Sequence, residues 1–179
     1  ARPPGRPRYD QDGELAAQGT VDPVALAALL DDPYFAAPAP KSTGRELFDT
    51  TYTARRLASV RPGLTGPDLV ATLTELTAVS VADALAGRDV RRVVASGGGA
   101  RNPVLLDRLR AALAERVPHA CEVVTSEALG LPVDAKEAYL FALLGFLSAP
   151  GLPGTAAGAP RRRAPGARRA GVLGSRTPP

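Results

Sequence analysis

The sequence is poor in the residue types on which many enzyme and metal sites depend. Its 179 residues include one cysteine and one histidine, and neither methionine nor tryptophan. The single cysteine, Cys121, excludes a disulfide within the chain and a cysteine-based metal site. The single histidine, His119, excludes a Cys/His cluster, and its place beside Pro118 disfavours a His-dependent catalytic triad. We therefore expect no metal site built from these side chains.

Long apolar runs are also absent. No stretch approaches the roughly 18 consecutive apolar residues that a membrane-spanning helix needs, and no signal peptide is visible. This predicts a cytoplasmic protein with no membrane partner. The chain begins at Ala1 rather than at a methionine, so we expect either a processed protein or a piece of a longer one.

Charge is distributed unevenly along the chain. The net charge is +4, but nine arginines lie in residues 1–8 and 151–179, where no acidic residue occurs, so that residues 9–150 carry −5. Segments rich in Pro, Gly and Arg bury too little apolar surface to fold. We predict a disordered end at 1–8, one folded unit at 9–150 and a mostly disordered tail at 151–179. A basic tail without aromatic residues predicts no specific nucleic-acid partner.

Apolar periodicity predicts an α/β fold that is rich in helix, with a few parallel strands. We expect helices at 22–31, 41–58, 68–87, 103–116 and 134–149, strands at 90–96 and 121–126, and an extended loop over 31–40. Asp22 and Asn102 each precede a proline and are expected to cap helices. The strongly apolar helix at 134–149 is expected to be buried. The core face of the helix at 68–87 is predicted to consist of Leu69, Leu73, Leu76, Ser80 and Ala84, flanked by Val70, Thr77 and Val81.

Three consecutive glycines, Gly97, Gly98 and Gly99, follow the first predicted strand and precede a helix. Glycines there permit either a plain tight turn or close approach of the backbone to an anion or nucleotide. A P-loop is excluded because no lysine follows, and the Rossmann fingerprint lacks its third glycine, since Asn102 stands there. The residues alone leave the turn and the nucleotide site as open alternatives.

The sequence contains four characteristic blocks in this order: "PYFAAPAPKSTGRELF", "DLVATLTELTAVSVADAL", "VVASGGGARNPVLLDRL" and "ALGLPVDAKEAYLFALLGFL". They make the sequence similar to the anhydro-N-acetylmuramic acid kinase family over roughly residues 9–155. The resemblance implies part of an actin-like ATPase (ribonuclease H-like) lobe. It also implies transfer of the ATP γ-phosphate, with Mg²⁺, to O6 of 1,6-anhydro-N-acetylmuramic acid. Hydrolytic ring opening would then give N-acetylmuramic acid 6-phosphate in peptidoglycan recycling.

The resemblance assigns site residues on both substrates. The three glycines are expected to border the adenosine or α-phosphate end of the nucleotide, and Asn102 to cap its helix and face the same ligand. Glu137 matches a family glutamate near the bound sugar, and Asp134 lies one helical turn before it. The alternative for these two is a helix cap, since Asp134 and Glu137 have capping-box spacing.

The family's phosphate loop and catalytic Asp belong to blocks that have no counterpart here. We therefore expect the carboxy-terminal part of a sugar kinase that is inactive alone. Its partner would be the amino-terminal lobe of the same protein, and an exposed apolar surface should mark where that lobe packs. A homodimer is left open. The alternatives are a non-catalytic nucleotide-binding or interaction remnant and a Rossmann-type domain that prefers a dinucleotide.

Overall fold

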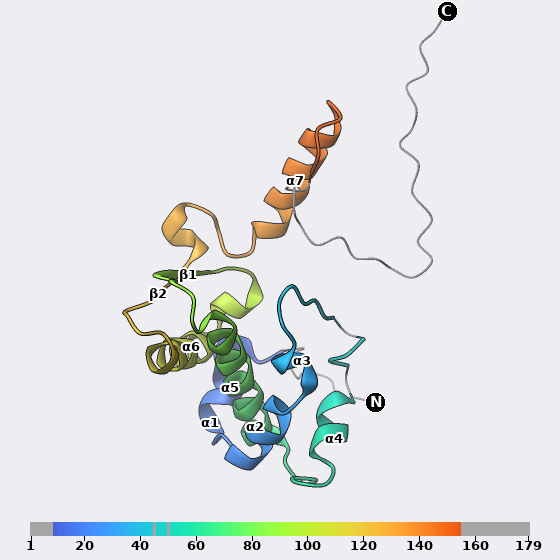
Figure 1. Cartoon of the computed structure of the whole chain (residues 1–179), viewed down its shortest axis with the longest axis vertical. Helices are drawn as coiled ribbons and strands as arrows, with labels where there is room; N and C mark the ends of the chain where they lie inside the picture. The colour runs from blue at the N-terminus through green and yellow to red at the C-terminus, as the bar shows by residue number, and fades with distance from the viewer. Residues whose placement is uncertain (1–8, 45, 50, 155–179) are drawn as a thin grey trace, which may run out of the picture.

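The structure is a computed structural model that describes residues 9–44, 46–49 and 51–154. The disorder predicted for 1–8 and for most of the tail lies outside these residues. The segments are η1 (Gln11–Gly13), α1 (Glu14–Gln18), α2 (Pro23–Leu30), α3 (Pro33–Ala36), α4 (Tyr52–Leu57), α5 (Gly66–Leu85), β1 (Arg92–Ala95), η2 (Gly98–Arg101), α6 (Pro103–Arg116), β2 (Glu122–Thr125), η3 (Ser126–Leu129) and α7 (Lys136–Ser148). Figure 1 shows α1, α2, α5 and α6 gathered beneath the strands, while α7 projects away from them.

The two strands form a parallel sheet, as the alternation of strands and helices predicts. Arg92 of β1 pairs with Glu122 of β2, and the register continues to Ala95 and Thr125. Because α6 connects the two strands, the unit is a βαβ crossover. Helices α5 and α6 cover one face of the sheet, and Val123 belongs to the buried cluster that they form.

Helix α5 carries the main core, but its buried face differs from the predicted one. The face is built from small and medium side chains that let α1 and α6 pack closely against the helix. The predicted residues Leu69 and Leu73 are only half-buried and pack against a second cluster, with α2 and α4. Of the predicted residues only Leu76 is buried, whereas Ala84, Thr77 and Val81 are exposed. The buried residues of α5 are Ala71, Thr72, Leu76, Ala78, Val79 and Ala82.

Helix α2 begins as the sequence predicts. The Asp22 side chain accepts hydrogen bonds from the backbone N–H groups of Val24 and Ala25, both at 2.9 Å. Pro23 occupies the first helical position, where its missing N–H is not needed. Asp22 also forms an ion pair with Arg61 at 2.7 Å, and these interactions lower the pKa of the Asp22 carboxyl, the backbone hydrogen bond of Ala25 being the main cause.

Two predictions between residues 33 and 58 are wrong. The expected loop contains the short helix α3, because Asp32 caps it by accepting the N–H of Tyr34 at 2.9 Å. Among the described residues of the helix expected over 41–58, only those of α4 are helical. Lys41 donates to the carbonyls of Tyr34 and Phe35 at 2.9 and 2.7 Å, which holds the start of this segment as a loop against α3.

Helix α7 contradicts the expectation of a buried helix. None of its residues is buried, and Tyr139, Phe141 and Phe146 are 61%, 69% and 72% exposed. The capping box of Asp134 and Glu137 is not formed, because the N-cap position is Ala135. The apolar pattern is real, but no described part of the chain covers the helix.

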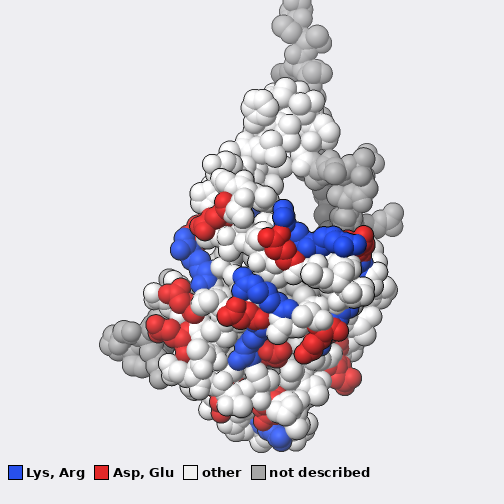
Figure 2. Space-filling model, turned by 90° about the vertical axis from the view of Figure 1, so that its left-hand side faces the viewer, with Lys and Arg blue, Asp and Glu red and all other residues white. Residues whose placement is uncertain are grey.

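Figure 2 shows the same feature on the surface. Charged side chains of both signs are interspersed over the lower body, whereas the upper part, where α7 lies, is white. None of residues 138–154 is charged. No described helix is both long enough and apolar enough to span a membrane.

Candidate functional site

The glycine turn lies at the carboxyl end of β1. Gly97 has a φ of +83°, in the left-handed region that favours glycine, and its N–H donates to the carbonyl of Val133 at 2.8 Å. Gly98 borders open space, since no described atom lies within 4 Å of where its Cβ would stand. Gly97 is thus needed for the turn itself, while Gly98 leaves the backbone open to a ligand.

Asn102 caps α6 as predicted. Its Oδ1 accepts the backbone N–H of Leu105 at 3.0 Å, and Pro103 is the first helical residue. The cap satisfies one of the free donors at the helix start. The side chain also lies against Gly13, where a Cβ atom would overlap its amide oxygen. Asn102 therefore has a structural role that does not depend on contact with a ligand.

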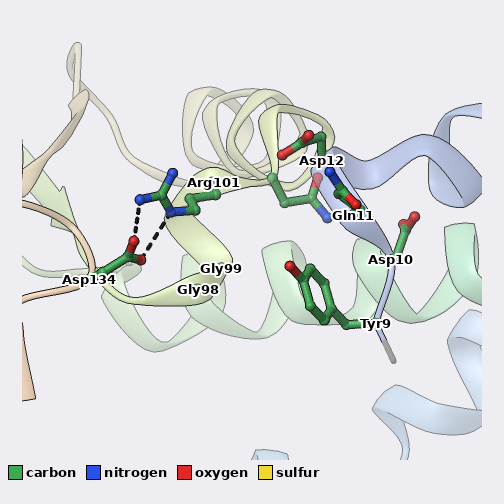
Figure 3. Close-up of a pocket in the computed structure, with 9 residues that line it drawn as sticks. Tyr9, Asp10, Gln11, Asp12, Gly98, Gly99, Arg101 and Asp134 are labelled. Carbon is green, nitrogen blue, oxygen red and sulfur yellow. Dashed lines mark hydrogen bonds and ion pairs between the residues drawn. The ribbon is translucent and has the colours of Figure 1, made fainter. Parts of the chain in front are cut away.

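A cavity of about 720 Å³ opens beside this turn. Figure 3 shows its two walls, the glycine turn with Arg101 on one side and the start of the described chain on the other. Of the predicted site residues, Gly98, Gly99, Asn102 and Asp134 line it, whereas Gly97 and Glu137 do not. Glu137 lies exposed in the first turn of α7. The complete lining is Tyr9, Asp10, Gln11, Asp12, Gly98, Gly99, Arg101, Asn102 and Asp134.

An ion pair ties the glycine turn to the loop before α7. Arg101 Nε donates to Asp134 Oδ1 at 3.0 Å, and a second hydrogen bond joins Arg101 Nη2 to Asp134 Oδ2. This bidentate contact lowers the pKa of the Asp134 carboxyl and raises the pKa of the Arg101 guanidinium. Together with the backbone hydrogen bond from Gly97 to Val133, it fixes the turn to residues 133–134.

Residues 9–12 form the opposite wall of the cavity, and none of the site residues predicted from the sequence lies in this segment. Asp10 is structural, because its carboxylate accepts the N–H groups of Leu15 and Ala16 at 2.8 and 3.1 Å. Asp12 has a φ of +52°, which is uncommon for a residue other than glycine. The one signal that the sequence offers is that residues 9–12 lie at the start of the range, roughly 9–155, over which the chain resembles the family.

Electrostatically, the described lining is acidic. It contains three carboxylates, those of Asp10, Asp12 and Asp134, and one guanidinium, that of Arg101. A further cation lies across the turn, because the Lys136 Nζ is 4.0 Å from where a Cβ of Gly97 would stand. Within the described ranges, no group of three or more His, Cys, Asp or Glu residues is placed to hold a metal ion.

The arrangement defines a class of protein. A parallel βαβ unit with a glycine turn and a cavity at the carboxyl end of its first strand is typical of α/β proteins, a class in which ligand sites lie at the strand ends.

Comparison with known proteins identifies the family. The model of the family "Anhydro-N-acetylmuramic acid kinase" matches residues 4–179. Curated proteins of that name are similar to this chain: the one from Streptomyces coelicolor is 51% identical over 97% of the chain, and the one from Burkholderia thailandensis is 50% identical over 89%. The chain belongs to the anhydro-N-acetylmuramic acid kinase family.

The match confirms the resemblance seen in the four sequence blocks and extends it beyond residues 9–155 toward both ends of the chain. The chain spans 42% of the length of each of these two relatives. It thus corresponds to a part of the kinases that it matches.

Proposed function

We propose that this chain is the carboxy-terminal, nucleotide-binding part of an anhydro-N-acetylmuramic acid kinase that acts in the cytoplasm. The complete protein would transfer the γ-phosphate of ATP to O6 of 1,6-anhydro-N-acetylmuramic acid. Water would open the anhydro bridge in the same reaction, giving N-acetylmuramic acid 6-phosphate for peptidoglycan recycling. The observation that carries the proposal is the cavity beside Gly98 and Gly99 in a chain of this family.

The cavity suits a nucleotide on three grounds. The open space at Gly98 is the space that a side chain would fill, so the backbone can lie directly against a ligand. The volume of about 720 Å³ is within the range of small-molecule sites. The turn is fixed to the loop of Val133 and Asp134, which preorganises this wall.

The sugar would bind near the start of α7. Glu137 lies in its first turn, exposed, and Asp134 lies at the rim of the cavity. The bond of Asp134 to Arg101 replaces the capping role that its spacing indicated. In the proposed complex Glu137 accepts hydrogen bonds from sugar hydroxyls, and Arg101 sets the position of Asp134 between the two substrates.

The remaining machinery is proposed to belong to the part of the protein that this chain does not cover. Phosphoryl transfer needs a phosphate cradle, a residue that orients the attacking water and metal charge compensation. Mg²⁺ supplies that compensation while bound mainly to ATP phosphates and water.

The exposed apolar side chains of α7 support the proposal that a second lobe packs on this helix. A helix with Phe141 and Phe146 about two-thirds or more exposed is favourable only when another surface covers it. We propose that this surface is the remainder of an actin-like fold. A second copy of the chain is the competing occupant.

Complementation tests the proposal directly. ATP binding to the full chain is measured by calorimetry, and product formation is followed with ATP, Mg²⁺ and 1,6-anhydro-N-acetylmuramic acid. We expect binding without turnover by the chain alone. Adding the amino-terminal part of the Streptomyces coelicolor relative should restore turnover, and Gly97→Val should abolish both effects while Gly63→Val preserves them.

Each failure has a separate meaning. Turnover by the chain alone would contradict its dependence on a second part. Binding without turnover in the complemented sample would favour the alternative of a non-catalytic nucleotide-binding remnant. Absence of ATP binding in both samples would contradict the nucleotide site.

A further inference from the structure

We infer that the segment Tyr9–Asp12 recognises the nucleoside half of the nucleotide, with Tyr9 stacking on the base and Asp12 accepting the ribose hydroxyls. The inference rests on the proposed function and decides which half of ATP occupies the cavity. It assigns a binding role to residues that lie far in sequence from the glycine turn and share one cavity with it.

The sign of the charge at the cavity favours the nucleoside. Three carboxylates line it, and the one guanidinium that lines it is committed to Asp134 through two hydrogen bonds. A polyphosphate placed there would meet a net negative wall, and like charges at close range repel. An adenosine is uncharged and meets no such penalty. The phosphates are better placed across Gly97, where the Lys136 ammonium lies.

Tyr9 provides a flat apolar surface on the wall opposite the glycine turn. Its side chain is free to meet a ligand, since the residue is 72% exposed. In Figure 3 the ring extends from its segment toward Gly98 and Gly99. Bases stack readily on aromatic side chains because every base has a π-face. A ring on one side and bare backbone on the other form a slot for a planar group.

Asp12 differs from its neighbour Asp10 in what its carboxylate does. The Asp10 carboxylate is occupied by two backbone N–H groups of α1. Asp12 lines the cavity instead, where its charge acts on the Arg101 guanidinium, and no hydrogen bond to its carboxylate is found among the described residues. A carboxylate facing a nucleotide is well suited to accept hydrogen bonds from ribose hydroxyls. The left-handed φ values of Asp12 and Gly13, +52° and +77°, shape the turn that presents it.

Binding measurements on the full chain test this assignment. Adenosine, ATP, 2′,3′-dideoxyadenosine and tripolyphosphate are compared by calorimetry. We expect adenosine and ATP to bind and tripolyphosphate not to bind. Tyr9→Ala should weaken adenosine binding about tenfold, the size of one stacking contact. The matched control is Tyr139→Ala, which removes another exposed tyrosine on α7 and should leave adenosine binding unchanged.

Asp12→Asn isolates the carboxylate, because asparagine also adopts left-handed backbone. We expect it to weaken adenosine binding several-fold and to leave 2′,3′-dideoxyadenosine binding unchanged, since that ligand lacks the two hydroxyls. The control is Asp107→Asn, which removes an exposed carboxylate on α6 that does not line the cavity.

The inference would be overturned by binding of tripolyphosphate without adenosine, or by variants at Tyr9 and Asp12 that bind adenosine as tightly as the unaltered chain. Failure of the unaltered chain to bind either ATP or adenosine would instead contradict the proposed nucleotide site as a whole.

Discussion

Gly13 lies so close to Asn102 that a methyl group on the glycine would overlap the amide oxygen of the asparagine. The same oxygen accepts the N–H of Leu105 at 3.0 Å and caps α6. One side chain thus joins the segment that forms one wall of the cavity to the helix behind the other wall. The cavity depends on this contact, because it sets how the two walls face each other.

Replacing Gly13 should therefore destabilise the fold. Gly13→Ala places a Cβ in a left-handed residue, at a φ of +77°, and against both Asn102 and the Val104 Cγ2. We expect a loss of about 1–3 kcal/mol in the free energy of unfolding, measured by urea denaturation. Gly63→Ala is the control, because no described atom lies within 4 Å of its Cβ position. Equal stability of the two variants would contradict the close packing of Gly13.

The caps of α6 and α5 offer a second comparison. Asn102→Ala removes a side-chain cap and should cost about 1 kcal/mol, as caps of this kind do. Thr65 occupies the N-cap position of α5 but makes no side-chain cap hydrogen bond, so Thr65→Ala should leave the unfolding free energy nearly unchanged. Thermal unfolding of both variants checks the difference. Similar losses would mean that the Asn102 cap adds little.

The Arg101–Asp134 pair makes a prediction about pH. Arg101 holds the pKa of Asp134 below its usual value of 3.8. A carboxyl whose pKa is lower in the folded state contributes stability above the unfolded pKa and loses it as the pH falls through the folded pKa. In Arg101→Gln, an NMR titration should therefore show the Asp134 pKa rising toward 3.8.

Arg92→Gln is the matched control for that titration. The Arg92–Glu122 pair has side-chain exposures of 56% and 54%, close to the 59% and 58% of Arg101 and Asp134, and it lies on the sheet. It should leave the Asp134 pKa unchanged. If Asp134 titrated alike in all three proteins, its contact with Arg101 would not persist in solution.

The exposed side chains of α7 are expected to affect self-association of the chain rather than its free energy of unfolding. Phe141→Ser combined with Phe146→Ser should reduce self-association in sedimentation velocity runs at several concentrations. It should change the unfolding free energy by no more than about 0.5 kcal/mol, because neither residue is buried. Leu113→Ala, at a position only 1% exposed, should cost about 2–5 kcal/mol. Strong destabilisation by the serine variants would show that α7 packs within the chain.

Local signals in the sequence predicted local structure well. Helices α2 and α6 were found because Asp22-Pro23 and Asn102-Pro103 specify their starts without help from the rest of the chain. The glycine turn was recognisable for the same reason, because three glycines between a strand and a helix predict either a tight turn or a ligand site. Parallel pairing of the strands followed from the helix between them.

What failed depends on contacts between distant residues. The segment over 41–49 has helical spacing, yet Lys41 is held by the carbonyls of Tyr34 and Phe35. The cavity wall at Tyr9 and Asp12 arises from the packing of Gly13 on Asn102, which no local pattern reports. The apolar character of α7 was read correctly, but burial requires a second surface, and the sequence of a helix does not state where that surface is.

The position of α7 also fixes an order of folding during synthesis. The two core clusters draw their buried side chains from residues between Ala25 and Val123. Both clusters are therefore complete in sequence once Val123 has been added to the growing chain, before any residue of α7 has been added. Helix α7 contributes no buried side chain to either of these clusters. Its aromatic side chains, exposed in the described chain, are therefore accessible to chaperones and proteases.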